Sequence, residues 1–232
     1  MEVLIDLDGT LLDPKPGILG SIQYALRRLG APVPPIDDLA WAIGPPLRTT
    51  FPRLLGDNGQ TEEAVALYRE NYRNGAMYDA VVYPGIRQAL DALTAAGCRL
   101  IIATAKPHLY ARPILERFDL ARHFTAIHGP ELDGTNDSKA DLIAHIIDRE
   151  RVKPDAAIMI GDRQMDVAAA ARNGMCTVGV TWGYGSIDEL TAAGAASLCA
   201  APPDLPRAVL CLLGSLRNSA RAVAPPVQLS HR

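Results

Sequence analysis

Five short apolar runs are spaced along the chain, and stretches with helical periodicity lie between most of them. Each run is nearly continuous rather than alternating, which is typical of strands that are covered on both faces. Strands that alternate with helices predict an α/β fold with a parallel sheet and helices on both of its sides. The runs are Val3–Ile5, Leu100–Ala103, Thr125–Ile127, Ala156–Ile160 and Thr177–Val180.

The block from residue 14 to residue 83 breaks this alternation, because it contains helical patterns only. Such a block is too long for a connecting loop. We therefore expect a small helical domain at 14–83, inserted after the first strand into a core built from 1–13 and 84–216. The alternative is that these helices pack directly on the sheet. Helices are predicted around Leu19–Leu29 and over Asp37–Ile43 and Glu62–Asn74.

The C-terminal part of the chain changes in character. Leu205–Leu216 has the pattern of a last helix, whereas 217–232 has few large apolar residues and a Pro-Pro pair. We expect residues 217–232 to form a flexible tail. Upstream, Leu109–Phe118 also has a helical pattern, in which Pro113 is expected to cause a kink or mark a new start.

Composition and charge exclude several classes of protein. Hydrophobic residues make up 48% of the 232 residues, and the net charge is −3 without long runs of one sign, which argues against a nucleic acid or a membrane surface as partner. The four cysteines form no CxxC pair, as expected of thiols in a reducing compartment. Early acidic residues and the lack of a long apolar stretch predict neither a signal peptide nor a membrane span. We expect a cytoplasmic monomer or homodimer.

Polar residues stand where the predicted strands end. The first strand ends at Asp6, the second at Thr104, and a later one at Gly161 and Asp162. Ligands of an open parallel sheet bind beyond the carboxyl ends of its strands, so these residues should meet in one crevice. Lys139 begins a helix after the third strand and can reach the same place.

The acidic residues of this crevice predict a metal. Asp6 and Asp8 leave the first strand toward one side, before Gly9 lets the chain turn. Together with Asp162 and Asp166 they form a cluster of like charges that requires a counter-charge. Mg²⁺, a hard cation that prefers oxygen ligands, is suited to it. The neighbouring lysine and threonine suggest a phosphate as the ligand and phosphoryl transfer as the reaction.

The full set of motifs resembles a known superfamily. DLDGTLLD, ATAKP, the lysine of NDSKADLI and GDRQMD follow one another in the chain, and together they resemble the four motifs of the haloacid dehalogenase superfamily. They are most similar to its phosphoglycolate phosphatase-like branch, which YPGI, GPPL and TWGYG also resemble. The resemblance covers residues 2 to about 215. It implies a Rossmann-like parallel sheet core with an inserted small α-helical cap domain between the first two motifs.

The resemblance also implies a role for each motif residue. Asp6 matches the nucleophile that forms an aspartyl-phosphate, and Asp8 matches the acid that protonates the leaving oxygen and then activates water. Thr104 and Lys139 match the groups that bind the phosphoryl oxygens, with Gly9 beside them in the substrate-binding set. The metal ligands would be Asp6, the backbone carbonyl of Asp8, Asp162, and Asp166 directly or through water.

Several functions are compatible with this pattern. The first is a Mg²⁺-dependent phosphatase that acts on a small phosphorylated metabolite, with phosphoglycolate as the default substrate. A 5'-nucleotidase is an alternative, because ELDGTNDSK (Glu131–Lys139) resembles relatives described in that way. A sugar phosphomutase is another alternative, although no clear set of sugar-binding residues is visible. A phosphoaccepting, receiver-like signalling switch is disfavoured, since receivers lack the Asp8-type acid and the inserted cap.

The cap is expected to select the substrate. GPPLRTTF (Gly44–Phe51) is the predicted loop that faces the leaving group, and its Arg48 either meets an anionic substrate tail or is a solvated surface residue. Lys106 and Arg163 flank motif residues, and for both we expect a solvent-facing side chain.

Overall fold

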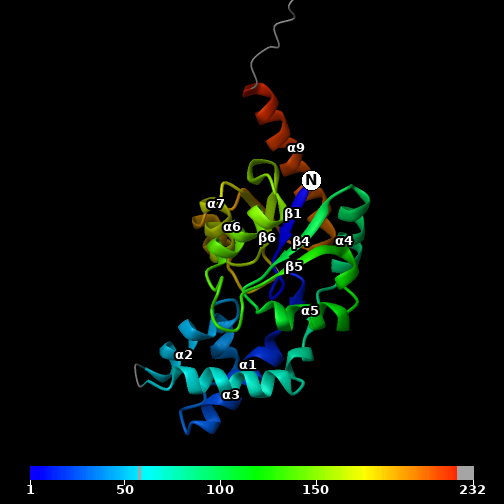
Figure 1. The fold of residues 1–232 in the computed structure, drawn as a ribbon. Helices are drawn as coiled ribbons and strands as arrows, with labels where there is room; N and C mark the ends of the chain where they lie inside the picture. The colour runs from blue at the N-terminus through cyan, green and yellow to red at the C-terminus, as the bar shows by residue number, and fades with distance from the viewer. Residues whose placement is uncertain (57–58, 224–232) are drawn as a thin grey trace, which may run out of the picture.

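The computed structural model describes residues 1–56 and 59–223, and it has two lobes (Figure 1). One lobe is built on a six-stranded sheet with the strand order β5-β4-β1-β6-β7-β8. All of its neighbouring strands pair in parallel. The predicted α/β fold with a parallel sheet is therefore confirmed. The strands are β1 (Glu2–Ile5), β4 (Arg99–Ala103), β5 (Phe124–His128), β6 (Ile158–Gly161), β7 (Cys176–Val180) and β8 (Ser197–Cys199).

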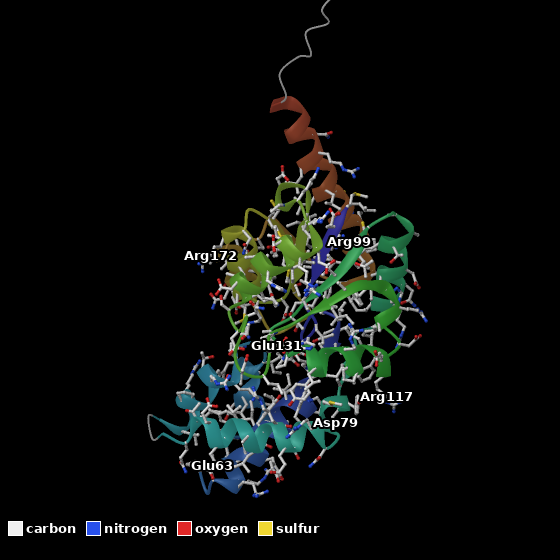
Figure 2. All side chains as sticks on the ribbon, viewed as in Figure 1. Glu63, Asp79, Arg99, Arg117, Glu131 and Arg172 are labelled. Carbon is white, nitrogen blue, oxygen red and sulfur yellow. The ribbon has the colours of Figure 1, made fainter. Side chains whose placement is uncertain are left out.

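Both faces of the sheet are buried, which explains why its strands are apolar without alternation. Val3 and Ile5 of β1 belong to a cluster with α4, α5 and α9, whereas Leu4 belongs to a second cluster with α6 and α7. Most of the charged side chains labelled in Figure 2, such as Arg117 and Arg172, are exposed, whereas Arg99 at the start of β4 is half-buried. The helices are α4 (Ile86–Ala95), α5 (His108–Arg117), α6 (Lys139–Glu150), α7 (Gln164–Arg172), α8 (Ile187–Ala192) and α9 (Leu205–Val223).

The second lobe consists of the helical elements that lie between β2 (Leu12–Asp13) and β3 (Val81–Val82) in the chain, and we call these elements the cap. It lies beyond the carboxyl ends of the strands (Figure 1). The two short strands β2 and β3 pair in antiparallel fashion where the chain enters and leaves it. Its apolar side chains include the fully buried Phe51. The cap elements are α1 (Lys15–Arg28), the 3₁₀ helix η1 (Ile36–Ala42), α2 (Leu47–Leu55), α3 (Thr61–Arg73) and the 3₁₀ helix η2 (Ala76–Tyr78).

Some local predictions were wrong. The segment predicted as a loop at Gly44–Phe51 contains the start of α2, and the predicted helix at Asp37–Ile43 is a 3₁₀ helix. The edge strand β8 was not predicted at all, because its three residues are too few to give a pattern. α5 continues through Pro113 as one helix, since four buried side chains on its inner face outweigh the single backbone hydrogen bond that proline removes.

The C-terminal helix is longer than predicted. α9 continues to Val223 rather than ending at Leu216, so the first part of the expected flexible tail is helical. The sequence after Leu216 includes Ala220 and Ala222, and alanine has the highest helix propensity. These residues extend a helix that is already formed and packed on the core through Val209 and Leu213, so no new nucleation is needed. The rest of the expected tail, 224–232, lies outside the described residues. Among the described helices, none is long and apolar enough to cross a lipid bilayer.

Candidate active site

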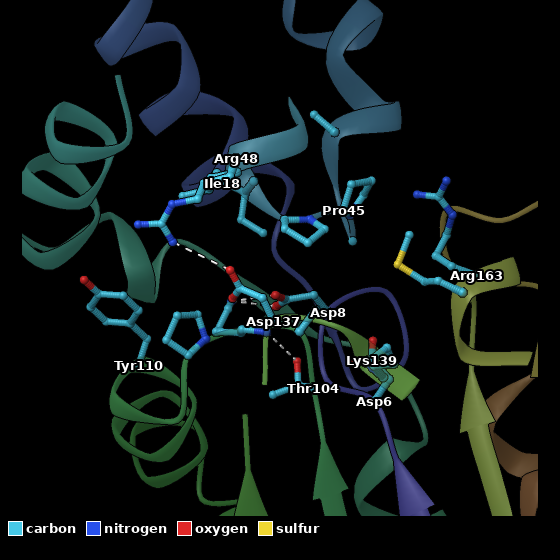
Figure 3. Close-up of a pocket in the computed structure, with 18 of the residues that line it drawn as sticks. Asp6, Asp8, Ile18, Pro45, Arg48, Thr104, Tyr110, Asp137, Lys139 and Arg163 are labelled. Atoms are coloured by element: carbon cyan, nitrogen blue, oxygen red, sulfur yellow. Dashed lines mark hydrogen bonds and ion pairs between the residues drawn. The ribbon is translucent and has the colours of Figure 1, made fainter. Parts of the chain in front are cut away.

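The carboxyl ends of three central strands bring the predicted site residues together. Asp6 follows β1, Thr104 follows β4 and Asp162 follows β6, while Lys139 and Asp166 lie in the first turns of α6 and α7. All five side chains are more than nine-tenths buried. Figure 3 shows Asp6, Thr104 and Lys139 at the floor of a cavity whose opposite side is formed by the cap.

Three carboxylates of this floor form a compact acidic cluster. Asp6, Asp162 and Asp166 each offer an oxygen, and these oxygens lie within 4.8 Å of one another. Burial raises the pKa of Asp162 well above its usual range, and the neighbouring Asp166 and Asp6 raise it further. Burial also raises the pKa of Asp166 to about 6, although Lys139 opposes this shift.

Lys139 is the ammonium group that the described part of the chain places against this cluster. Its Nζ lies 2.6 Å from Asp6 Oδ1 and 2.8 Å from Asp166 Oδ1. Burial disfavours the charged form of Lys139, but Asp166 and Asp6 outweigh it and raise the pKa of the lysine. One ammonium cannot balance three carboxylates. The remaining negative charge and the oxygen donors fit a hard divalent cation such as Mg²⁺.

Asp162 is held by a backbone N–H and a side-chain hydroxyl that sequence analysis did not assign. Tyr184 donates its backbone N–H to Asp162 Oδ2 at 2.8 Å, and Thr10 donates its hydroxyl to Oδ1 at 3.3 Å. A Cβ on Gly183 would lie 2.4 Å from Asp162 Oδ2, so only glycine allows this approach. The TWGYG segment therefore supports an acidic site residue, and its two glycines were the signal that could have indicated this.

Gly9 lies against the acidic cluster, and its predicted part in substrate binding stays a prediction. It is not among the residues that line the cavity. Its φ of +85° requires glycine, and a Cβ there would lie 2.2 Å from Asp162 Oδ2. Gly9 thus packs directly against a carboxylate of the acidic cluster.

Asp8 lies beside the cluster and has its own cationic partner. Lys106 Nζ lies 2.7 Å from both carboxylate oxygens of Asp8 and also donates to the hydroxyl of Tyr72, at 2.6 Å. Burial raises the pKa of Asp8, and Lys106 partly offsets this shift. The solvent-facing side chain expected for Lys106 was wrong, because the lysine is 8% exposed.

Arg163 also turns inward, contrary to prediction. It donates to the backbone carbonyl of Ile43 in the cap at 2.6 Å and to Glu189 Oε1 at 2.9 Å. Tertiary contacts with two elements distant in sequence hold it, and neither is visible from its neighbours in the chain. Arg163 therefore joins the cap to the core next to Asp162.

Arg48 reaches the cavity from the start of α2 (Figure 3). Its guanidinium donates to both carboxylate oxygens of Glu62, at 2.8 and 3.1 Å, and lies 3.6 Å from Asp137 Oδ2 across the cleft between cap and core. Two acidic partners already share its positive charge, so an anionic substrate tail would have to compete with them.

The cap side of the cavity is largely apolar and aromatic. Tyr68 and Tyr72 stack with ring centroids 5.2 Å apart, and Tyr110 of the core meets Tyr72 edge-on at 5.5 Å. The other apolar residues that line the cavity are Ile18, Ala42, Pro45, Pro46, Leu47 and Val65 from the cap, and Ala105, Pro107 and Met165 from the core. This wall suits a leaving group that carries an apolar or ring-shaped part.

The family model for haloacid dehalogenase-like hydrolases matches residues 3–180, well over half of the chain. The chain belongs to the haloacid dehalogenase-like hydrolase family. A 5'-nucleotidase of Pseudomonas aeruginosa is 45% identical over 86% of this chain and 90% of that protein. A phosphoglycolate phosphatase of Nitrosospira multiformis is 31% identical over 78% of this chain and 83% of its own length. The chain is thus a phosphoric monoester hydrolase of the phosphoglycolate phosphatase-like branch.

Two further comparisons concern a solved structure and a relative with a different name. A predicted phosphatase from Clostridium acetobutylicum has a TM-score of 0.87 and 38% identity, covering 90% of this chain and 97% of the other. The tyrosine-protein kinase PtkA of Mycobacterium tuberculosis is 41% identical over 80% of this chain, but the match spans only 64% of PtkA. The sheet with its inserted helical lobe is therefore that of haloacid dehalogenase-like phosphatases.

Proposed function

We propose that the protein is a Mg²⁺-dependent phosphatase that hydrolyses a small phosphomonoester through an aspartyl-phosphate on Asp6. The observation that supports this most directly is the arrangement of the cavity floor. Asp6 lies 2.6 Å from the ammonium of Lys139, within reach of two further carboxylates, and Asp8 stands beside it. A nucleophile, a cationic group and an acid are thus present in one buried place.

The first half of the reaction transfers the phosphoryl group to Asp6. A carboxylate oxygen of Asp6 attacks phosphorus, and the bond between phosphorus and the leaving oxygen breaks. Asp8 gives its proton to that oxygen, so the product leaves as an alcohol. Thr104 donates its hydroxyl to a phosphoryl oxygen, and Lys139 offsets the negative charge of the phosphoryl group.

The second half returns Asp6 to its initial state. The carboxylate of Asp8 takes a proton from water, whose oxygen attacks phosphorus. The bond between phosphorus and the Asp6 oxygen breaks, so inorganic phosphate leaves and the Asp6 carboxylate is restored. Mg²⁺, when held by Asp6, Asp162, Asp166 and the carbonyl of Asp8, supplies positive charge that stabilises the transferring group. The cap covers the site during both steps and keeps bulk water from it.

The test is release of inorganic phosphate from p-nitrophenyl phosphate with and without Mg²⁺. We expect continuous release that a chelator abolishes and Mg²⁺ restores. Asp6→Asn should lose turnover while keeping its circular dichroism spectrum, and Asp8→Asn should form the phosphoenzyme but scarcely hydrolyse it. Normal turnover by Asp6→Asn would end the covalent mechanism.

The receiver-like switch predicts a different result in the same assay, namely one burst with a stable phosphoprotein. Transfer between sugar phosphates without phosphate release would instead indicate a mutase. The few polar groups on the cap side of the cavity offer little to hold the hydroxyls of a sugar. Membership of the phosphatase-containing family and the inserted cap also argue against a receiver.

A nucleoside monophosphate is the substrate class that the cavity favours over phosphoglycolate. The tyrosine and proline wall can pack against a ring, whereas a carboxylate tail would need a cation. Among the cationic residues that line the cavity, Lys106, Arg48 and Arg163 already have carboxylate partners, and Arg69 donates to the Leu132 carbonyl. The substrate preference is tested by comparing the catalytic efficiency of the enzyme on nucleoside monophosphates, phosphoglycolate and sugar phosphates. Higher efficiency on phosphoglycolate than on every nucleotide would reverse the preference.

A further inference from the structure

Lys106 makes a buried connection between the cap and Asp8. It lies in the turn after β4, Asp8 in the turn after β1, and Tyr72 near the end of α3 in the cap. The lysine ammonium is within 2.7 Å of both Asp8 oxygens and 2.6 Å of the Tyr72 hydroxyl. All three residues are less than 9% exposed. Buried charge-assisted hydrogen bonds of this length are strong and directional.

Both ends of this connection are held firmly. The Tyr72 ring is fixed between the stacked Tyr68 and the edge-on Tyr110. On the core side, the backbone N–H of Lys106 donates to the Thr104 hydroxyl at 3.2 Å. A Cβ on Gly129 would lie 2.1 Å from the Lys106 carbonyl oxygen, so this neighbouring loop packs tightly on it. The position of the Tyr72 hydroxyl relative to Asp8 therefore depends on the position of the cap.

We propose that Lys106 is a positioning residue that orients Asp8 for proton transfer only while the cap holds Tyr72 against it. This inference rests on the proposed function, in which Asp8 is the acid and then the base. The Tyr72 hydroxyl accepts one of the three ammonium hydrogens, and the others point to the Asp8 carboxyl group. Once the proton of Asp8 has moved to the leaving oxygen, Lys106 stabilises the carboxylate left behind.

The cap then not only covers the site but also controls the orientation of Lys106. When the cap moves away, Tyr72 moves with it, and Lys106 loses the partner that fixes the direction of its ammonium group. Proton transfer then takes place efficiently only in the closed arrangement, after the substrate has been enclosed. This would protect the site from unproductive hydrolysis of the phosphoenzyme while it is open to water.

The experiment is a double-mutant cycle on kcat with Tyr72→Phe, Lys106→Met and the double variant. We expect Tyr72→Phe to lower kcat about tenfold and Lys106→Met about 100-fold, the lower end of what a positioned acid or base contributes. KM should change little. Because Tyr72 acts through Lys106, the double variant should be no slower than Lys106→Met alone. Lys106→Arg should restore part of the lost rate.

A matched control removes a tyrosine hydroxyl elsewhere in the cap. Tyr24 donates to Glu70, also in the cap, at 2.9 Å on the exposed side. Tyr24→Phe should leave kcat unchanged. Circular dichroism and thermal melting show whether each variant is folded, and Tyr72→Phe, which deletes a single oxygen, keeps the test valid if Lys106→Met does not fold.

A second readout separates positioning from a merely structural role. Phosphoenzyme formation in Lys106→Met, followed by rapid quench, should slow less with p-nitrophenyl phosphate than with an alkyl phosphate, because nitrophenolate leaves without a proton. Equal slowing on both substrates, additive losses in the cycle, or unchanged kcat in Tyr72→Phe would overturn the inference. The proposed function fails separately, through an active Asp6→Asn or the absence of phosphate release by the wild type.

Discussion

At the scale of single residues, the position of the acidic side chains depends on neighbouring groups that take no part in the proposed reaction. Asp162 is placed by the Tyr184 N–H, by the Thr10 hydroxyl and by the close approach of Gly183 and Gly9. A buried carboxylate of raised pKa is costly to keep in place without such donors. The residues around a metal-binding carboxylate therefore decide its geometry as much as its own identity does.

Gly183→Ala tests this support. The added methyl group would lie 2.3 Å from the Gly9 carbonyl oxygen and 2.4 Å from Asp162 Oδ2, so both the turn at Gly9 and the carboxylate must shift. We expect the Mg²⁺ concentration for half-maximal activity to rise about tenfold, in the range seen for changes around a metal ligand. Titration of activity with Mg²⁺ measures it. Gly214→Ala is the control, since nothing lies within 4 Å of a Cβ there, and an equal response in both variants would contradict the role of Gly183.

At the scale of elements, α9 shows how a helix far from the site contributes to the core. Val209 and Leu213 are buried against the sheet face that also carries α4, whereas Leu210 on the outer side is 36% exposed. Only one stripe of the helix packs, as expected for a surface helix. Its last described turns, beyond Leu216, begin with the exposed Arg217 and Asn218.

Substitutions in α9 should therefore affect stability unequally. Leu213→Ala is expected to lower the free energy of unfolding by about 2–5 kcal/mol through lost burial and the cavity left behind. Leu210→Ala should change it by less than about 1 kcal/mol. Truncation after Leu216 should leave activity unchanged. Denaturant unfolding and phosphate release measure these effects, and equal destabilisation by both leucine variants would contradict the packing described.

At the scale of the whole molecule, polar contacts join the cap to the core around the cavity. Arg163 reaches the Ile43 carbonyl, Arg69 donates to the Leu132 carbonyl at 3.0 Å, and Lys106 contacts Tyr72. Each crosses between the lobes, and apolar contacts such as that between Tyr72 and Tyr110 accompany them. Such contacts favour the closed arrangement while leaving the cap able to open for substrate and product.

Arg69→Ala should weaken closure without touching the acidic floor. Loss of one hydrogen bond between cap and core is worth about 0.5–1.5 kcal/mol. KM should therefore rise about two- to tenfold, because Arg69 both joins the cap to the core and lines the cavity, and kcat should stay within about twofold. Steady-state kinetics measure both constants. Arg73→Ala, an exposed arginine on the same helix, should leave KM unchanged, whereas a KM of Arg69→Ala equal to that of the wild type would contradict this account.

The sequence by itself determined the sheet, the helical insertion and the convergence of Asp6, Thr104, Lys139 and Asp162. These features follow from short-range apolar periodicity and from the rule that parallel strands end at one edge. Such signals are local, so they can be read from neighbouring positions along the chain. The weakest predictions were element ends, such as that of α9, where packing rather than pattern decides.

Only the tertiary structure decided which side chains outside the motifs reach the site. Lys106 meets Asp8 across 98 positions of the chain and Tyr72 across 34, and Arg163 meets Ile43 across 120. No spacing rule relates residues so far apart. Their side chains turn inward because the core supplies a carboxylate to each and the cap supplies a further hydrogen-bond acceptor, and charged groups are buried only where such partners exist.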